Sequence, residues 1–299
     1  MLRNKQCLRG LGLPGNRKAL KFKLLACIIM TIFAPENYQP SQKMISPLMT
    51  IYGSVGVGKS TFAASFPKPF FFDFEGRTLH IKNIVRDADY GIDVANLQNW
   101  GQLINAVHEL GATDFKTIVF DGITTLQNFV WEEVARQLNN ANPRNMAYGV
   151  GYGRAAELFA SLMFSAKELQ LKHNKIIIFI DHEKVKEEDA LVVNSKSICK
   201  YHPECMNGIS KILAKESDYI FRLTENITIR EDKKTGDTSA IFNGLILQTD
   251  RKHFLEAELK SSLPLPAMIK ATYEDFKEAY KSAYQEIHTD HKAQEKIAI

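Results

Sequence analysis

The sequence predicts an α/β protein whose central sheet is mostly parallel and carries helices on both faces. Apolar runs and helical patterns alternate along residues 49–184, and this alternation is typical of a parallel sheet. The apolar runs are nearly continuous, as expected of strands that are buried on both faces. They lie at residues 49–52, 69–76, 116–122 and 174–184. The helical patterns that separate them lie at residues 97–110, 126–138 and 155–172.

The composition is that of an ordinary globular protein. The chain has 299 residues, of which 45% are hydrophobic and 24% are charged, so it can bury a sizeable core. The net charge of +4 permits a polyanionic partner without requiring one. The chain has 4 cysteines, which are too few and too scattered for a disulfide framework. We therefore expect a reducing, cytoplasmic setting.

The N-terminal residues leave three interpretations open. Basic residues precede the short apolar stretch Leu24–Ala34, and this order resembles a secretory signal. The stretch is too short to span a bilayer comfortably, and no later stretch is long and apolar enough, so we expect no membrane partner. The segment is an upstream extension of a chain that starts at Met44 or Met49 rather than Met1, an attached arm, or an export signal.

A glycine-rich loop follows the first apolar run. Residues Gly53–Ser60, "GSVGVGKS", match the pattern G-x-x-x-x-G-K-[ST] at every fixed position, between a predicted strand and a predicted helix. The N–H groups of such a loop and the N-terminus of the helix attract phosphate oxygens. Lys59 is expected to reach the β- and γ-phosphates of ATP, and Ser60 to bind Mg²⁺. The expected nucleotide-binding residues are Gly53, Ser54, Val55, Gly56, Val57, Gly58, Lys59, Ser60 and Thr61.

Polar residues end the other predicted strands. Hydrolysis of a bound nucleotide requires an acid that positions the metal and a group that orients water. Asp121 has the pattern of a Walker B acid, which would hold Mg²⁺. Asp73 and Glu75 are two residues apart and are therefore expected on the same side of an extended chain, where one carboxylate could activate water. His182 could hydrogen-bond the γ-phosphate. The alternatives are that Asp121 caps the next helix, that the carboxylate after the second strand is a solvated turn acid, and that His182 is structural.

In this order the motifs resemble the core of RecA-like ATPases, over residues 44–224. The stretches that carry the resemblance are the glycine-rich loop, "FFDFEG", "TIVFDGITTL", "IIFIDHEK" and "YGVGYGRAAELF". They are most similar to a phage-borne branch of AAA-type ATP-binding proteins, which are regarded as single-strand annealing ATPases. The resemblance implies that Lys59, Glu75, Asp121 and His182 are catalytic, with Glu75 as the base and His182 as the γ-phosphate sensor. RecA commonly has glutamine at the sensor position, so this chain departs from the pattern there.

Candidate contacts with single-stranded DNA follow the predicted sensor strand. RecA-like proteins contact DNA in this neighbourhood, where lysines could neutralise phosphates and tyrosines could stack on bases. The candidates are Lys184, Lys186, Lys196, Lys200, Lys211, Lys215, Tyr148, Tyr152 and Tyr201. Acidic residues are interleaved with these lysines, so an ordinary solvated face is the alternative. Arg154 and Arg222 are candidates for a finger that reaches the nucleotide of a neighbouring subunit in a homo-oligomer.

The C-terminal part carries no catalytic motif. Residues 226–250 predict a β-hairpin around a Lys-Lys-Thr-Gly-Asp turn, and residues 273–287 predict an amphipathic helix. Cys199, His202 and Cys205 offer soft metal ligands, but zinc prefers four, so we expect buried or partly buried cysteines rather than a metal site. The predicted domains are an N-terminal extension that the functional protein need not contain, a RecA-like ATPase domain and a helical tail, at residues 1–43, 44–262 and 263–299.

The motifs predict a Mg²⁺-dependent ATPase, and the resemblance implies that it acts on single-stranded DNA in phage-type recombination or annealing. Two alternatives stay open. The first is a P-loop switch that acts on protein partners without contacting DNA. The second is a small-molecule kinase, which is disfavoured because the sequence shows no evident arginine-rich lid.

Overall fold

The computed structural model is organised around a ten-stranded sheet. It describes residues 44–91, 99–188, 198–231 and 238–297. Residues 45–299 form one compact unit. The strands are β1 (Leu48–Gly53), β2 (Pro69–Asp73), β3 (Val85–Arg86), β4 (Thr117–Asp121), β5 (Ile176–Glu188), β6 (Ile198–Pro203), β7 (Tyr219–Glu231), β8 (Thr238–Gln248), β9 (Lys260–Ser261) and β10 (Met268–Lys270). The helices are α2 (Lys59–Ala64), α3 (Trp100–Glu109), α4 (Ile123–Gln137), α5 (Val150–His173), α6 (Asn207–Glu216) and α7 (Tyr273–Ile297).

The parallel part of the sheet aligns the ends of its strands. The order along the sheet is β10-β8-β7-β1-β5-β4-β2-β3, and every pair from β7 to β3 is parallel. Strand β5 therefore lies between the strand that leads into the glycine-rich loop and the strand that ends at Asp121. The register places Gly53 beside His182 and Asp73 beside Asp121. The predicted site residues consequently meet at one edge of the sheet.

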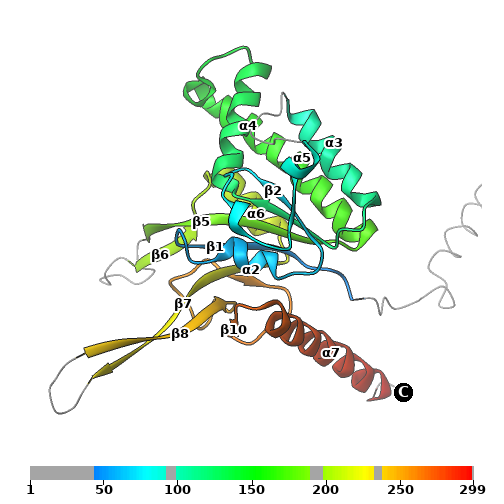
Figure 1. Ribbon diagram of the computed structural model, residues 1–299, viewed down its shortest axis with the longest axis vertical. Helices are drawn as coiled ribbons and strands as arrows, with labels where there is room; N and C mark the ends of the chain where they lie inside the picture. The colour runs from blue at the N-terminus through cyan, green and yellow to red at the C-terminus, as the bar shows by residue number, and fades with distance from the viewer. Residues whose placement is uncertain (1–43, 92–98, 189–197, 232–237, 298–299) are drawn as a thin grey trace, which may run out of the picture. The chain divides into compact units, whose positions relative to one another are not determined.

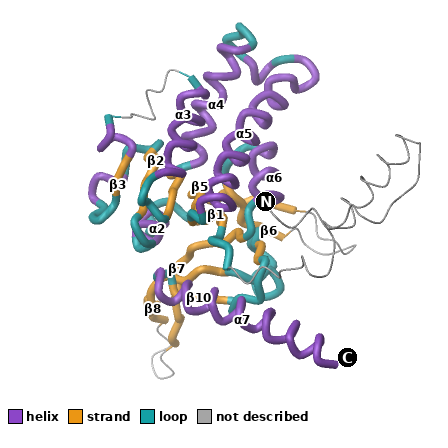
Figure 2. Tube along the Cα trace, turned by 90° about the vertical axis from the view of Figure 1, so that its right-hand side faces the viewer, coloured by secondary structure: helices purple, strands orange, loops and turns teal. Residues whose placement is uncertain are grey.

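Helices cover both faces of the sheet, as the sequence predicted. Helices α3, α4, α5 and α6 pack on one face, and α2 and α7 pack on the other (Figures 1 and 2). The strand residues alternate between the two layers, because successive side chains of a strand point to opposite faces. Phe72, Phe120 and Phe179 face the first layer, and their rings stack across β2, β4 and β5 with centroids 5.1 and 4.7 Å apart.

Local signals set the ends of the helices near the site. The side chain of Asn99 accepts a hydrogen bond from the backbone N–H of Gln102, and helix α3 begins directly after it. Helix α5 ends at His173, and Asn174 directly after it adopts the left-handed conformation common at helix C-termini. The predicted helices at residues 126–138 and 155–172 correspond to α4 and α5. The predicted helix at residues 97–110 corresponds to α3, and its residues 97 and 98 lie outside the described residues.

The C-terminal part extends the sheet with antiparallel strands. Strand β8 pairs with β7 on one side and with β10 on the other, so the predicted hairpin is present. The predicted C-terminal helix is present as α7. Phe276 and Tyr280 of α7 are buried with Phe66, which follows α2. Residues 268–283 thus complete the layer that covers the glycine-rich loop's side of the sheet. Among the described residues, no helix is long and apolar enough to cross a membrane.

Candidate functional site

The glycine-rich loop turns sharply between β1 and α2. Gly58 has a φ of 99°, in the left-handed region that side chains rarely adopt, and it is followed by the first residue of α2. The loop itself is open to a ligand, since Ser54, Val55 and Gly56 are exposed. Val57 instead packs into the core beneath the loop. The arrangement matches the strand, loop and helix that the phosphate-binding motif requires.

Lys59 lies buried at the base of the loop, with only 6% of its surface exposed. Its ammonium group donates hydrogen bonds to the backbone carbonyls of Gly53 and Ser54, at 2.9 and 2.8 Å. Burial lowers the pKa of Lys59, and the nearby carboxylates of Asp121 and Glu75 oppose this effect. The side chain is therefore a pre-positioned cation in a site of low solvent exposure, where it attracts phosphate strongly.

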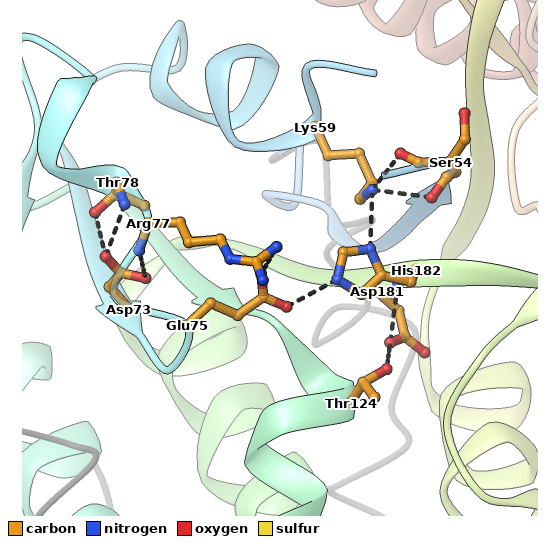
Figure 3. Close-up of polar contacts among 10 residues, drawn as sticks. Ser54, Lys59, Asp73, Glu75, Arg77, Thr78, Thr124, Asp181 and His182 are labelled. Carbon is orange, nitrogen blue, oxygen red and sulfur yellow. Dashed lines mark hydrogen bonds and ion pairs between the residues drawn. The ribbon is translucent and has the colours of Figure 1, made fainter. Parts of the chain in front are cut away.

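His182 connects Lys59 with Glu75. Its Nδ1 atom lies 3.5 Å from the Lys59 ammonium, and its Nε2 atom lies 2.9 Å from Glu75 Oε1 (Figure 3). Because an ammonium group can only donate, Nδ1 must accept, and this leaves the proton on Nε2 to be donated to the carboxylate. A neutral Nε2–H imidazole therefore fits both neighbours. The row Glu75, His182 and Lys59 joins the ends of three chain segments.

Asp121 and Ser60 form an oxygen-rich pair beside this row. Burial raises the pKa of Asp121 to about 6, and a hydrogen bond with Ser60 opposes the increase. The carboxylate is only 5% exposed. A hydroxyl and a carboxylate are the kind of hard oxygen ligands that Mg²⁺ prefers, and Mg²⁺ usually keeps several waters beside one or two protein ligands. The residues present therefore fit a Mg²⁺ ion.

The two acidic residues at the end of β2, Asp73 and Glu75, point in different directions, which corrects the expectation that they share one side. Strand β2 ends at Asp73, and the chain then turns. Asp73 accepts hydrogen bonds from the backbone N–H groups of Arg77 and Thr78 and from the Thr78 hydroxyl. Glu75 reaches the opposite way, toward His182 (Figure 3). The two-residue period of a strand does not apply across a turn.

The sequence analysis did not identify two residues of the site, Gly122 and Thr124. A Cβ atom at Gly122 would lie 2.6 Å from Glu75 Oε1, so a larger residue there would require the Glu75 carboxylate to shift from the position in which it meets His182. Thr124 donates a hydrogen bond of 2.7 Å to Asp181, whose carboxylate also accepts from the backbone N–H of Cys205. Burial raises the pKa of Asp181. The glycine after a strand-terminal acid was the available signal for the first residue, whereas the contact of Thr124 depends on the fold.

Several of the candidates for contact with DNA or with a neighbouring subunit instead contact other residues of the same chain. Lys184 donates to the carbonyls of Glu204 and Cys205. The guanidinium of Arg222 lies 3.6 Å from the centroid of the Tyr201 ring and forms an ion pair with Glu183, so both side chains are held internally. Arg222 is consequently unsuited to the role of a finger. Lys196 lies outside the described residues.

Other candidates remain accessible. Tyr148 is fully exposed, and Tyr152 is 48% exposed, with its ring edge packed on Trp131 at a centroid distance of 5.0 Å. Arg154 forms an exposed ion pair with Glu157. Cys205 is buried, as expected, whereas Cys199 is exposed at the start of β6, which corrects the expectation that both cysteines are buried or partly buried. In the parts of the chain that the structure describes, no three histidine, cysteine or acidic side chains are grouped to hold a metal ion.

A small groove adjoins the glycine-rich loop. It has a volume of about 300 Å³, and Thr61, Ala64 and Ser65 of the α2 region form one wall. His80, Ile81 and Lys82, from the segment after β2, form the other. This groove lies at the next turn of the helix from Lys59 and Ser60, and it combines apolar and polar atoms. It is therefore a candidate place for the nucleoside part of a ligand whose phosphates meet the loop.

The strand order and the loop define a P-loop nucleotide-binding protein with a RecA-like core. The chain belongs to the AAA domain family, whose model matches residues 46–252. No curated protein matches the chain. The crystal structure of the RadB recombinase is similar at 14% identity and a TM-score of 0.33, with 73% of this chain and 92% of that chain covered. The flagellar accessory protein FlaH from Methanocaldococcus jannaschii is similar at 13% identity and a TM-score of 0.35, covering 68% and 84%.

Proposed function

We propose that this protein binds ATP together with Mg²⁺ and hydrolyses the γ-phosphate. The observation that carries this proposal is the row Glu75, His182 and Lys59, in which a carboxylate and a phosphate-binding ammonium are joined through one imidazole. A protein that only held a nucleotide would need the ammonium but not the carboxylate. The row places a candidate base for water next to the group that would hold the phosphate under attack.

Each residue then has a distinct task. Lys59 and the N–H groups of the loop bind the phosphates, and Ser60 and Asp121 hold the metal. When bound, Mg²⁺ neutralises charge that develops on the phosphate oxygens. Glu75 takes a proton from water, and Gly122 leaves the space that its carboxylate requires. His182 changes its hydrogen bond to Lys59 when that ammonium binds phosphate, and it can thereby report the presence of the γ-phosphate to Glu75.

A single-stranded nucleic acid is the partner that we propose for this ATPase, with recombination or annealing as its setting and a homo-oligomer as its working form. The support is the resemblance to the phage-borne branch together with Tyr148 and Tyr152, which remain open to stacking. A P-loop switch for protein partners is the competing proposal. The two differ in one measurable respect, since only the first predicts that single-stranded DNA changes the rate of hydrolysis.

The first experiment measures phosphate release by the full chain with ATP and Mg²⁺. We expect Lys59→Ala to lower the rate about 100-fold or more, because it removes the charge that holds the phosphates. Lys172→Ala is the matched control, since Lys172 is exposed on α5 and its ion pair among the described residues is with Glu168, and this variant should hydrolyse ATP at the wild-type rate. Equal rates for wild type and Lys59→Ala would contradict the proposed function.

The second experiment repeats the measurement with and without single-stranded DNA. Stimulation that is lost in the double variant Tyr148→Ala, Tyr152→Ala would support the DNA partner. Tyr90→Ala is a control of the same chemical change, since Tyr90 is also exposed but lies in the segment after β3. A rate that is indifferent to DNA across a salt series would favour the switch.

A further inference from the structure

The β7–β8 hairpin projects beyond the helical layers (Figure 1). It carries an apolar face. We call residues 226–231 and 238–243 the arm. Ile227 pairs with Phe242 and Ile229 pairs with Ala240 across the two strands, so these four side chains share one face. Ile227, Ile229 and Phe242 are 48, 72 and 61% exposed. The other face carries mostly polar side chains, at Thr228, Arg230, Ser239 and Asn243, and its one large apolar residue among those described, Ile241, pairs with Thr228 and is half-buried.

Such an arm needs a partner to bury this face. A two-stranded ribbon on its own is marginally stable in water, and a cluster of exposed large apolar side chains on one face marks an interaction surface. The polar opposite face makes the arm one-sided, as expected of an element that lays one face against another molecule. In the described part of the chain, no helix or strand covers the apolar face.

A groove on the same chain has matching chemistry. It has a volume of about 780 Å³ and is formed by the segment that follows β8. Leu255, Leu259, Leu263 and Leu265 line it, and Leu255 is 64% exposed. Arg251 and Lys252 stand at its wall, and neither forms an ion pair with another described residue. Asp250 also lines the groove, but its carboxylate is engaged by His253 at 2.8 Å.

Charge orients the arm relative to this groove. Glu231 lies two residues beyond Ile229, and therefore on the same face of β7, at the distal end of the apolar side chains. It forms no ion pair among the described residues. When the apolar face lies on the leucines of the groove, Glu231 can meet Arg251 or Lys252. The apolar face of the arm, which ends at the acidic Glu231, therefore matches in chemistry the groove, which is lined by leucines and has Arg251 and Lys252 in its wall.

The arm cannot reach the groove of its own chain while the hairpin keeps its pairing. Phe242 and Thr249, at the edge of the groove, are separated by seven residues of extended chain, or about 23 Å. The paired strands hold the arm extended over this length. We propose that the arm of one copy inserts into the groove of a second copy, in a head-to-tail contact between two different surfaces, which propagates into a ring or a filament. This proposal rests on the homo-oligomer of the proposed function, for which it names the contact, and it does not depend on the ATPase activity, which is measured separately by phosphate release.

The test compares arm and groove variants of the full chain by sedimentation velocity without nucleotide. The arm variant is Ile229→Asp with Phe242→Asp, and the groove variant is Leu255→Asp. We expect the wild type to sediment as assemblies larger than the 33.9 kDa chain, and each variant as a monomer. Thr228→Asp places the same charge on the polar face of the same strand, and we expect this control to assemble like the wild type.

Mixing the two variants gives the decisive result. The arm variant retains an intact groove, and the groove variant retains an intact arm, so an equimolar mixture should form heterodimers of twice the chain mass and nothing larger. A misfolded variant could not restore this contact. A monomeric wild type, assembly that survives both substitutions, or a mixture that stays monomeric would each overturn the proposal, including the case in which the arm serves a different partner.

Discussion

The edge of the parallel sheet buries ionisable side chains, whereas the arm exposes large apolar side chains. At the edge, Lys59, Asp121 and Asp181 are buried charged groups, and each has partners at hydrogen-bond distance. On the arm, Ile229 and Phe242 are large apolar groups that lie in solvent. Burial of ionisable groups costs free energy that their partners within the chain only partly offset, and the apolar surface of the arm is exposed to water without a cover from the described residues. Each is therefore best explained by something that binds there.

The comparison also shows how differently the two regions should respond to substitution. The site depends on single atoms, since each polar group is aligned with a defined neighbour. The arm offers a surface, so its side chains contribute to binding together and little to the fold of one chain. Substitutions should therefore have large effects on chemistry at the first region and small effects on monomer stability at the second.

The largest effect is expected at Glu75. Glu75→Gln keeps an oxygen that can accept the hydrogen bond from His182 Nε2 but removes the basicity that water activation requires. We expect kcat to fall about 1,000-fold, or about 4 kcal/mol in transition-state stabilisation, with nucleotide affinity retained. Single-turnover hydrolysis and equilibrium binding of a fluorescent ATP analogue measure the two quantities separately.

Asp73→Asn is the matched control for Glu75→Gln. Asp73 ends the strand that precedes Glu75, and its carboxylate accepts hydrogen bonds within the turn to Thr78. Its replacement should therefore lower the free energy of unfolding and leave kcat close to the wild-type value. Wild-type turnover by Glu75→Gln would remove the proposed role of Glu75 as the base. A loss of nucleotide binding in that variant would instead assign Glu75 to binding.

A smaller effect is expected from the titration of Asp121. Burial raises its pKa to about 6 in the folded chain, whereas the unfolded value is about 4. The folded state therefore binds more protons between these values, and its stability should fall as the pH rises from about 4 to 6, by about 3 kcal/mol. Urea unfolding at a series of pH values, without metal or nucleotide, measures this slope.

Asp121→Asn isolates the contribution of this carboxyl. The amide has a similar shape but does not titrate, so the variant should lose the part of the slope that Asp121 supplies, while Asp181, whose pKa is also raised, contributes equally in both proteins. Mg²⁺ with nucleotide should stabilise the wild type more at pH 7 than at pH 5, because the ion binds the carboxylate form. Identical slopes in the two proteins would contradict the assignment.

The sequence predicted the site better than the arm for a physical reason. The glycine-rich loop follows β1 and Asp121 ends β4, and the apolar runs of these strands placed their ends within one or two residues. His182 was expected at the end of its strand, but β5 continues to Glu188 because it pairs with β6 beyond the parallel sheet. Glu75 was predicted as a site residue, but the direction of its side chain was predicted wrongly, because the strand ends at Asp73 and a turn follows. In the same way, the contact between Thr124 and Asp181 joins two elements that only the folded chain brings together.

The arm was predicted as a hairpin but not as a surface. The alternation Ile227, Thr228, Ile229 has the two-residue period of a strand with one buried face. The same period describes a strand whose apolar face is exposed, so pattern alone cannot distinguish these cases. Strand β7 begins inside the parallel sheet at Tyr219 and leaves it near an irregularity between Glu225 and Ile227. Whether the next residues are covered depends on what packs beside them in three dimensions.

The smallest effect is expected on the arm itself. At concentrations where the chain is monomeric, Ile229→Asp should change the free energy of unfolding by about 0.5 kcal/mol or less, as is usual for exposed positions. Phe72→Ala, in the stacked aromatic row of the core, should cost about 3–5 kcal/mol. Urea denaturation of both variants measures the contrast. A loss of several kcal/mol in Ile229→Asp would mean that this side chain is buried within its own chain, and the arm would then have no free apolar face to offer a second copy.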